Sequence, residues 1–378
     1  MKKLLSFFVC IAFILGVSAP VRAESTVPAG KAKILIEAET GQVLYSQNAD
    51  MKLPMASVTK VMSLLLWAEA IDRGELSLED KVKASSYASE TEGSVIWLEP
   101  GEEMTAAELI EAVIISSAND ACIALAEHLS GSEAQFVKQM NRRAAELGMS
   151  STRYTNCVGF DDSGHYTTAR DIAVCTAELM KHDVYRGWML TWLDYLRGGK
   201  TQLVNTNKLV RSYNGILGGK TGTTDNAGCC LTVCAERSNM RLVAVTLGCD
   251  DDDERFSSAK ELLDYGFNSF ERFTPEVDYS QLKPIKVTHG AEREVDPIIK
   301  NQGIDCMIKK GRASDIKYEY TFVEGCEAPV SAGQFLGEYL VTLDGAEVFR
   351  SEIVAEKDIP KMSFWRCLQM IFREIFTK

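Results

Sequence analysis

Patterns typical of β-strands occur at both ends of a segment whose middle is helical, and this arrangement constrains the fold more than any other feature of the chain. Near the N-terminus, two alternating runs surround the turn Glu39-Thr40-Gly41, which predicts a β-hairpin. Two further strand patterns are joined by the turn Arg237-Ser238-Asn239, and a helix is predicted over residues 254–270. A sheet built from both ends, with helices beside it, is an α+β or three-layer arrangement. The four strands are predicted at residues 33–37, 42–45, 229–235 and 241–247.

The middle of this segment carries clear helix signals. Residues 57–70 are rich in Leu, Met and Ala, which predicts a buried helix. Two capping-box pairs, Thr105 with Glu108 and Ser132 with Gln135, precede apolar runs and mark two more helix starts. The middle third is therefore predicted to be mostly helical.

The composition changes near Thr274-Pro275. Residues 280–356 contain short alternating runs separated by Gly, Asp and Pro, which predicts a small all-β domain, a sandwich. Residues 361–378 have a different pattern, because apolar residues share one side of a helical projection and polar residues the other. The apolar side holds Phe364, Leu368, Ile371, Phe372 and Ile375, and the opposite side holds Arg366, Gln369 and Arg373.

The two chain ends favour export and membrane attachment. Lys2 and Lys3 precede an apolar stretch and then small residues up to Ala23, which is the pattern of a secretory signal peptide. An N-terminal anchor is the alternative. The C-terminal segment is too charged to span a bilayer, so we expect an interfacial anchor, with docking on the β domain as the alternative. The predicted organisation is 1–23 signal peptide, 24–274 main domain, 275–358 β-sandwich and 359–378 amphipathic helix.

Charge and cysteine content exclude several classes of protein. A formal charge of −12 disfavours a general nucleic-acid binder, which needs a basic surface for phosphates. Eleven Cys among 378 residues is far below the content of a disulfide scaffold. Only four His are present and no C-x-x-C pair occurs, so we expect no metal site. Cys306 and Cys326, both in the β-rich region, are the pair expected to be closest to a disulfide.

Among the nucleophile motifs, S-x-x-K has the best support. The chain contains neither G-x-S-x-G nor H-E-x-x-H, and its Gly218–Thr221 run lacks the first glycine of a Walker A loop, since position 214 is Asn. Ser57 and Lys60 lie at the start of an apolar helix, where i, i+3 spacing puts both side chains on one face. A lysine can remove the serine proton only if burial or a neighbouring cation lowers its pKa. Two further S-x-x-K matches, Ser257/Lys260 and Ser314/Lys317, are expected to be exposed.

Two more motifs follow in order. Ser117-Ala118-Asn119 is predicted in a loop between helices. Lys220-Thr221-Gly222 begins a β run, where Gly222 lets a ligand approach the backbone closely. Each motif alone is weak evidence for a functional site. The three motifs in this order, with separations of about 60 and about 100 residues, are a specific signal.

This ordered set resembles the low-molecular-mass penicillin-binding proteins that are serine D-alanyl-D-alanine carboxypeptidases. The resemblance extends over nearly all of residues 24–378, and Cys157-Val158 and Thr223 are its visible departures. It implies a penicillin-binding/β-lactamase-like transpeptidase domain, with a central antiparallel sheet flanked by helices, before the β-sandwich and the amphipathic helix. Further matching segments are Pro54–Ser57, Thr155–Gly159, His165–Asp171, Asn205–Asn207 and Ala227-Gly228.

The resemblance also implies catalytic roles. Ser57 would attack the carbonyl of the penultimate D-alanine and form an acyl-enzyme. Lys60 would be the general base, kept neutral with help from the nearby charge of Lys220. Ser117 would relay a proton to the leaving amine. Water would then hydrolyse the ester, and neither metal nor cofactor is required.

The remaining motif residues would bind substrate. Asn119 would hold the substrate amide and the catalytic lysine, and Lys220, Thr221 and Thr223 would attract the terminal carboxylate. Gly222 would allow close approach, and the backbone N–H groups of Ser57 and Thr223 would form the oxyanion hole. His165, by contrast, is interpreted as structural.

The implied partners are peptidoglycan stem peptides ending in D-Ala-D-Ala, with β-lactam antibiotics as covalent inhibitors, on the outer face of the cytoplasmic membrane. A DD-endopeptidase or transpeptidase of the same fold is an alternative. A β-lactamase and an inactive wall-binding scaffold are others; the first is disfavoured because the chain lacks a Leu-Asn dipeptide, and the second because the motif residues are intact.

Overall fold

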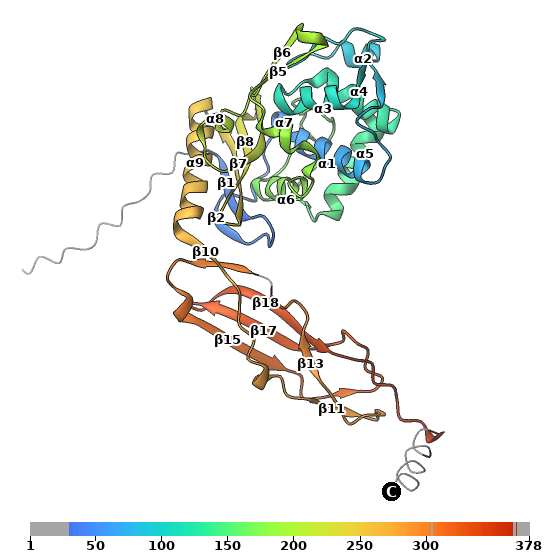
Figure 1. Cartoon of the computed structure of the whole chain (residues 1–378), viewed down its shortest axis with the longest axis vertical. Helices are drawn as coiled ribbons and strands as arrows, with labels where there is room; N and C mark the ends of the chain where they lie inside the picture. Colours follow the sequence, from blue (N-terminus) through green and yellow to red (C-terminus); the bar gives the residue numbers. More distant parts are fainter. Residues whose placement is uncertain (1–29, 304, 366–367, 369–378) are drawn as a thin grey trace, which may run out of the picture.

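The computed structural model describes residues 30–303, 305–365 and 368. It consists of a larger α+β part and an elongated β part that follows it in the chain (Figure 1). The predicted signal peptide lies outside the described residues, as does most of the predicted C-terminal helix.

A five-stranded antiparallel sheet forms the centre of the larger part, in the order β2-β1-β9-β8-β7. The first hairpin turns where predicted, because the Glu37 carboxylate accepts hydrogen bonds from the backbone N–H groups of Glu39 and Thr40. The predicted single sheet from both ends of the segment is confirmed, since β1 pairs directly with β9. The strands are β1 (Ala32–Glu37), β2 (Val43–Gln47), β7 (Ile216–Thr224), β8 (Gly228–Arg237) and β9 (Met240–Cys249).

Helices cover both faces of this sheet (Figure 1). The long helix α9 (Asp252–Ser269) packs on one face, where Leu242 of β9 joins a core cluster with Phe256 and Leu262. On the other face, Val243 and Val245 join the larger core made with the helical block. Because successive strand residues point to opposite faces, this alternation produces three layers.

The helical block contains the predicted helices, with one difference at the S-x-x-K motif. Thr105 and Glu108 form the full capping box of α3, and Ser132 accepts from Gln135 N at the start of α5. Ser57, however, lies in a 3-10 turn rather than in the α-helix itself. The elements are η1 (Ala56–Thr59), α1 (Lys60–Asp72), α2 (Ser86–Ser89), α3 (Ala106–Ile115), α4 (Asn119–Ser130), α5 (Glu133–Glu146), α6 (Ala169–Leu179), α7 (Arg186–Leu190) and α8 (Leu209–Ser212).

Two small two-stranded antiparallel sheets accompany the helical block. One pairs β3 (Lys81–Lys83) with β4 (Glu103–Thr105), and the other pairs β5 (Leu193–Leu196) with β6 (Thr201–Val204). The chain leaves β6 through Asn205 and Thr206. The hydroxyl of Thr206 then accepts a hydrogen bond from Thr221 Oγ1 on β7. The β5-β6 hairpin therefore helps position the motif Lys220–Gly222 on β7.

The β part is a sandwich, as predicted. A three-stranded sheet, β12-β11-β16, faces a four-stranded sheet, β13-β18-β17-β15, and Val287, Val295, Leu336 and Ile353 pack between them. A third pair, β10-β14, begins the β part at Phe270, a few residues before the predicted boundary at 274/275. The strands are β10 (Phe270–Phe273), β11 (Ile285–Thr288), β12 (Glu294–Val295), β13 (Pro297–Ile299), β14 (Cys306–Lys309), β15 (Ile316–Phe322), β16 (Cys326–Glu327), β17 (Phe335–Leu343) and β18 (Ala346–Ala355).

The cysteine pair expected in this region is not joined. Cys306 lies on β14 and Cys326 on β16, which belong to different sheets, and both are free thiols. At the C-terminal side, Ile359 and Lys361 still form β-bridges to Val330 and Gly290, so the sandwich extends past residue 359, where the amphipathic segment was predicted to begin. No helix within the described residues is both long and apolar enough to cross a membrane.

Candidate active site

The turn that carries Ser57 has a strained backbone and packs against two glycines. Ala56, directly before the serine, has a φ of +48°, a left-handed conformation that is costly for alanine. A Cβ on Gly159 would lie 1.9 Å from the carbonyl oxygen of Ala56, and a Cβ on Gly222 would lie 2.8 Å from Ser57 N. Only glycines can therefore stand on either side of this turn, which fixes where the Ser57 hydroxyl points.

Lys60 lies at the centre of the site. Its Nζ donates to Ser57 Oγ at 2.9 Å, to Asn119 Oδ1 at 2.7 Å and to the backbone oxygen of Val158 at 2.9 Å. The side chain is fully buried, and loss of hydration lowers the pKa of Lys60 to about 8, against the raising effect of Cys122 and other neighbours. A large fraction of this lysine is therefore neutral near pH 8 and can accept the serine proton.

The Ser117 and Asn119 motif comes from the bend between α3 and α4. Ser117 is buried with a φ of +64°, and its Oγ has no hydrogen-bond partner among the described residues. Asn119 is fixed on both sides of its amide, because Oδ1 accepts from Lys60 and Nδ2 donates to the carbonyl of Glu92 at 2.7 Å. The structure thus brings Asn119 directly onto Lys60, and the Ser117 hydroxyl has no partner among the described residues.

The third motif lies on β7. Lys220 is buried, and its Nζ donates to the carbonyl of Thr221 at 3.0 Å. Burial lowers the pKa of Lys220 well below its usual value, and the charges of Lys60 and Arg255 lower it further. The repulsion expected between the two lysines thus lowers the pKa of Lys220, whereas burial is the main cause of the low pKa of Lys60.

Arg255, on α9, is part of this site and is not predicted by the sequence motifs. Its Nη1 donates to the carbonyl of Gly222 at 3.0 Å and to Thr223 Oγ1 at 2.9 Å, and its Nη2 pairs with Asp252. This buried guanidinium fixes the end of the motif and adds positive charge behind it. A lone arginine after an acidic run gives no local signal for this role, because the contact joins two distant elements.

His165 is linked by hydrogen bonds to the turn that carries Ser57. Its Nδ1 accepts from the backbone N–H of Thr155 at 3.1 Å, so the proton lies on Nε2, which donates to Thr59 Oγ1 at 2.7 Å. Thr59 in turn donates to the carbonyl of Ala56 at 2.8 Å. Burial lowers the pKa of His165 to about 4, so the ring is neutral at pH 7. These contacts agree with the structural interpretation.

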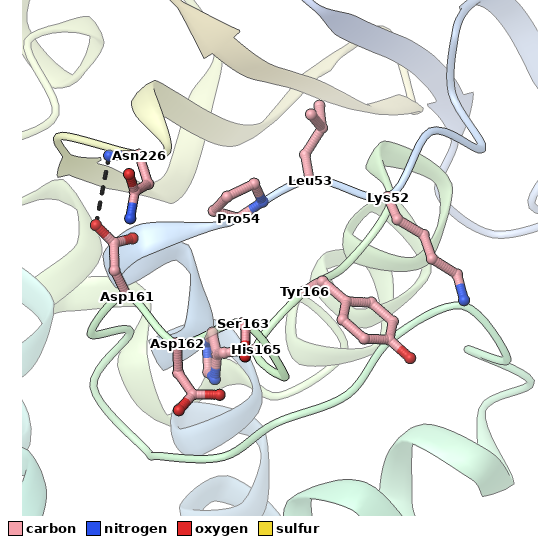
Figure 2. Close-up of a pocket in the computed structure, with 9 residues that line it drawn as sticks. All are labelled: Lys52, Leu53, Pro54, Asp161, Asp162, Ser163, His165, Tyr166 and Asn226. Carbon is pink, nitrogen blue, oxygen red and sulfur yellow. Dashed lines mark hydrogen bonds between the residues drawn. The ribbon is translucent and has the colours of Figure 1, made fainter.

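A pocket of about 500 Å³ adjoins the nucleophile turn (Figure 2). Asp161 closes one side by accepting from Thr224 Oγ1 at 2.7 Å and from Asn226 N at 3.4 Å. On the other side, Lys52 Nζ lies 4.7 Å from the centre of the Tyr166 ring. The predicted catalytic side chains do not line this pocket, so the hydrogen-bond geometry identifies the site rather than the cavity. The lining residues are Lys52, Leu53, Pro54, Asp161, Asp162, Ser163, His165, Tyr166 and Asn226.

With this geometry established, comparison with known proteins assigns the chain. A family model described as D-alanyl-D-alanine carboxypeptidase matches residues 19–251. The chain belongs to this family. A second model, described as the C-terminal domain of penicillin-binding protein 5, matches residues 270–361 of the carboxypeptidase. Its N-terminal limit coincides with β10, which agrees with the strand pairing seen in the structure.

Named relatives match the carboxypeptidase over most of its length. The D-alanyl-D-alanine carboxypeptidase DacF of Bacillus subtilis is 39% identical, with 88% of this chain and 87% of the relative covered. DacC of Escherichia coli, also named D-alanyl-D-alanine carboxypeptidase, is 33% identical, and the match covers 94% of this chain and 92% of the relative. The solved structure of penicillin binding protein 5 from Haemophilus influenzae has a TM-score of 0.79 at 28% identity. The match covers 88% of this chain and 99% of that structure. The ampicillin-bound form of penicillin-binding protein D2 from Listeria monocytogenes has a TM-score of 0.58 at 31% identity. The match covers 63% of this chain and 97% of that structure.

Proposed function

We propose that this carboxypeptidase removes the terminal D-alanine from peptidoglycan stem peptides through an acyl-enzyme on Ser57. The observation that carries the proposal is the 2.9 Å contact between Lys60 Nζ and Ser57 Oγ, combined with a lysine pKa near 8. A neutral amine at that distance can take the hydroxyl proton as the oxygen attacks. Family membership and the relatives named above support the same reaction.

Binding of the substrate carboxylate is assigned to the β7 motif. Lys220, Thr221 and Thr223 would receive the carboxylate of the terminal D-alanine, and Arg255 holds Thr223 in place from behind. A charge-assisted hydrogen bond of this kind contributes roughly 1.5–3 kcal/mol. The carboxylate would also compensate the buried charge of Lys220, so we infer that substrate binding favours the protonated form of that lysine.

Stabilisation of the transition state is assigned to two backbone donors. The N–H groups of Ser57 and Thr223 would hold the oxyanion of the tetrahedral intermediate. The close packing of Gly222 on Ser57 N supports this placement, because it brings β7 against the nucleophile turn. Ser117, whose Oγ has no partner among the described residues, would pass the proton to the leaving amine. Water then hydrolyses the ester and releases the shortened peptide.

β-Lactams are proposed as covalent inhibitors of the same serine. The structural likeness to a penicillin-binding protein with bound ampicillin supports this. We expect labelled penicillin to form an adduct that persists for minutes or longer, while peptide substrates release D-alanine steadily. Rapid multiple turnover of penicillin without D-alanine release would instead indicate a β-lactamase.

The nucleophile is tested by mapping the penicillin adduct. We expect the labelled peptide to contain Ser57 and the label to be lost in Ser57→Ala. Ser257→Ala and Ser314→Ala are matched controls, because those serines belong to the other two S-x-x-K matches and are exposed. Adduct on any serine other than Ser57 would contradict the assignment.

Export and attachment to the outer face of the cytoplasmic membrane are proposed from the two chain ends. The signal-peptide pattern over residues 1–23 supports export. Phe364 and Trp365 are 76% and 72% exposed, which supports contact with an apolar phase at the start of the amphipathic segment. A chain truncated after Pro360 should move from the membrane to the soluble fraction and keep its D-alanine release. Continued sedimentation with membranes would contradict the anchor.

A further inference from the structure

Two cysteines lie side by side next to the catalytic lysine. Cys122, on α4, and Cys157, in the segment after α5, are both fully buried, and their sulfur atoms are 3.9 Å apart. Cys122 Sγ also lies 3.4 Å from the backbone oxygen of Cys157. A disulfide has a sulfur separation of about 2.0 Å, so the pair is already in contact and needs a shift of about 2 Å to bond.

Both cysteines belong to segments that hold Lys60. Asn119, three residues before Cys122 on α4, accepts from Lys60 Nζ, and so does the carbonyl of Val158, the residue after Cys157. The Cys157 backbone is anchored as well, because its carbonyl accepts from Ser63 Oγ of α1 at 2.9 Å. A bond between the sulfurs would draw these two segments together, and we expect it to alter the two contacts that orient Lys60.

We propose that Cys122 and Cys157 are an oxidisable pair, and that the disulfide between them slows acylation of Ser57. The inference rests on the proposed function, because the effect is read through that acylation. The co-reactant is a low-molecular-weight disulfide. Burial raises the pKa of Cys122, but contact with Cys157 and the charge of Lys60 outweigh this and lower the pKa below its usual value. The lower pKa favours Cys122 as the attacking thiolate.

The exchange needs no other oxidant. The Cys122 thiolate attacks one sulfur of the small disulfide, which forms a mixed disulfide and releases one small thiol. Cys157 loses its proton, displaces the second small thiol and closes the protein disulfide. Two protein thiols are oxidised and one small disulfide is reduced to two thiols. Because both sulfurs are buried, the reaction requires transient opening of the segment around Cys157 and is slower than at an exposed thiol.

The test uses the full chain and cystamine as the small disulfide. The folded protein is incubated at 37 °C, quenched in acid at intervals and divided between peptide mapping and acylation by fluorescent penicillin. We expect a peptide pair joined through Cys122 and Cys157 to accumulate while the acylation rate falls about 10²-fold, the loss that a misplacement of about 1 Å at a catalytic group can cause. Dithiothreitol should restore the rate.

Two variants make the result specific. Cys122→Ala lacks the attacking thiolate, so it forms neither the mixed disulfide nor the closed pair and should keep its acylation rate after cystamine. Cys175→Ala, which removes another buried thiol on α6, should be inhibited like the wild type. Equal acylation rates before and after the joined peptide forms would overturn the coupling, and the absence of that peptide would overturn the pair. Failure of the reduced protein to label Ser57 would instead contradict the proposed function, so the two failures are distinguishable.

Discussion

Replacing Gly222 by alanine tests whether the packing of β7 on the nucleophile turn is needed for acylation. A Cβ at this position would lie 2.8 Å from Ser57 N, 2.9 Å from the carbonyl oxygen of Met55 and 2.9 Å from Val58 N. All three atoms belong to the backbone, so none can rotate away as a flexible side chain would. The strand and the turn must separate for the methyl group to fit.

The expected size of the effect follows from these distances. Ordinary van der Waals contact for a Cβ begins at 3.4 Å, so the two segments must move apart by about half an ångström. A displacement of about 1 Å at a catalytic group can cost 10²-fold in rate, which makes the expected loss for Gly222→Ala roughly tenfold. Overpacking of this kind costs about 1–3 kcal/mol of folding stability. Both effects should appear together, because one movement causes them.

The assay is the second-order rate constant for acylation by fluorescent penicillin, measured with the melting temperature of the same sample. Gly187→Ala is the matched control, because no atom lies within 4 Å of a Cβ at that position and its helix should gain about 0.5–1 kcal/mol from the substitution. A Gly222→Ala protein that acylates within twofold of the wild type would refute the claim that this contact sets the oxyanion donors.

Two further predictions concern pH. The acylation rate should rise about tenfold per pH unit up to a pKa near 8, because only neutral Lys60 accepts the serine proton, and Lys60→Arg should abolish the reaction; a flat profile from pH 6 to 9 would exclude this base. For His165, the folded pKa of about 4 lies below the unfolded value of about 6.5, so the unfolded state binds more protons between these values and stability must fall as pH falls through that window. Urea unfolding should show a loss of about 2 kcal/mol between pH 7 and pH 5 that is absent in His165→Gln, and an equal loss in that variant would assign the effect to other groups.

Local signals in the sequence predict most of the elements. The hairpin around Thr40, the capping box at Thr105 and the helix start at Ser132 each depend on residues within a few positions of one another, so their patterns are visible in one chain. The three motifs likewise predict that Ser57, Asn119 and Lys220 belong to one site. The structure brings the first two together through Lys60.

Long-range contacts account for what the sequence does not show. Arg255 reaches Gly222 from another layer of the fold, and the carbonyl of Val158 reaches Lys60 from a distant loop. The 3-10 turn at Ser57 depends on packing by Gly159, which is about a hundred residues away in the chain. Such contacts are set by tertiary packing, and no periodicity or spacing in a single sequence encodes them.

The helix α9 also connects the two parts of the molecule. Its first turn carries Arg255, which contacts the β7 motif, and the helix ends where β10 begins to pair with β14 of the sandwich. Its 18 residues make a rod about 27 Å long. Gln42, on the hairpin side of the catalytic part, also exchanges two hydrogen bonds with the backbone of Met307 on β14. The two parts are therefore joined both by the β10-β14 pairing and by the hydrogen bonds between Gln42 and Met307. The same helix therefore carries, in its first turn, the arginine that holds the carbonyl of Gly222, and at its other end it leads into the sandwich (Figure 1).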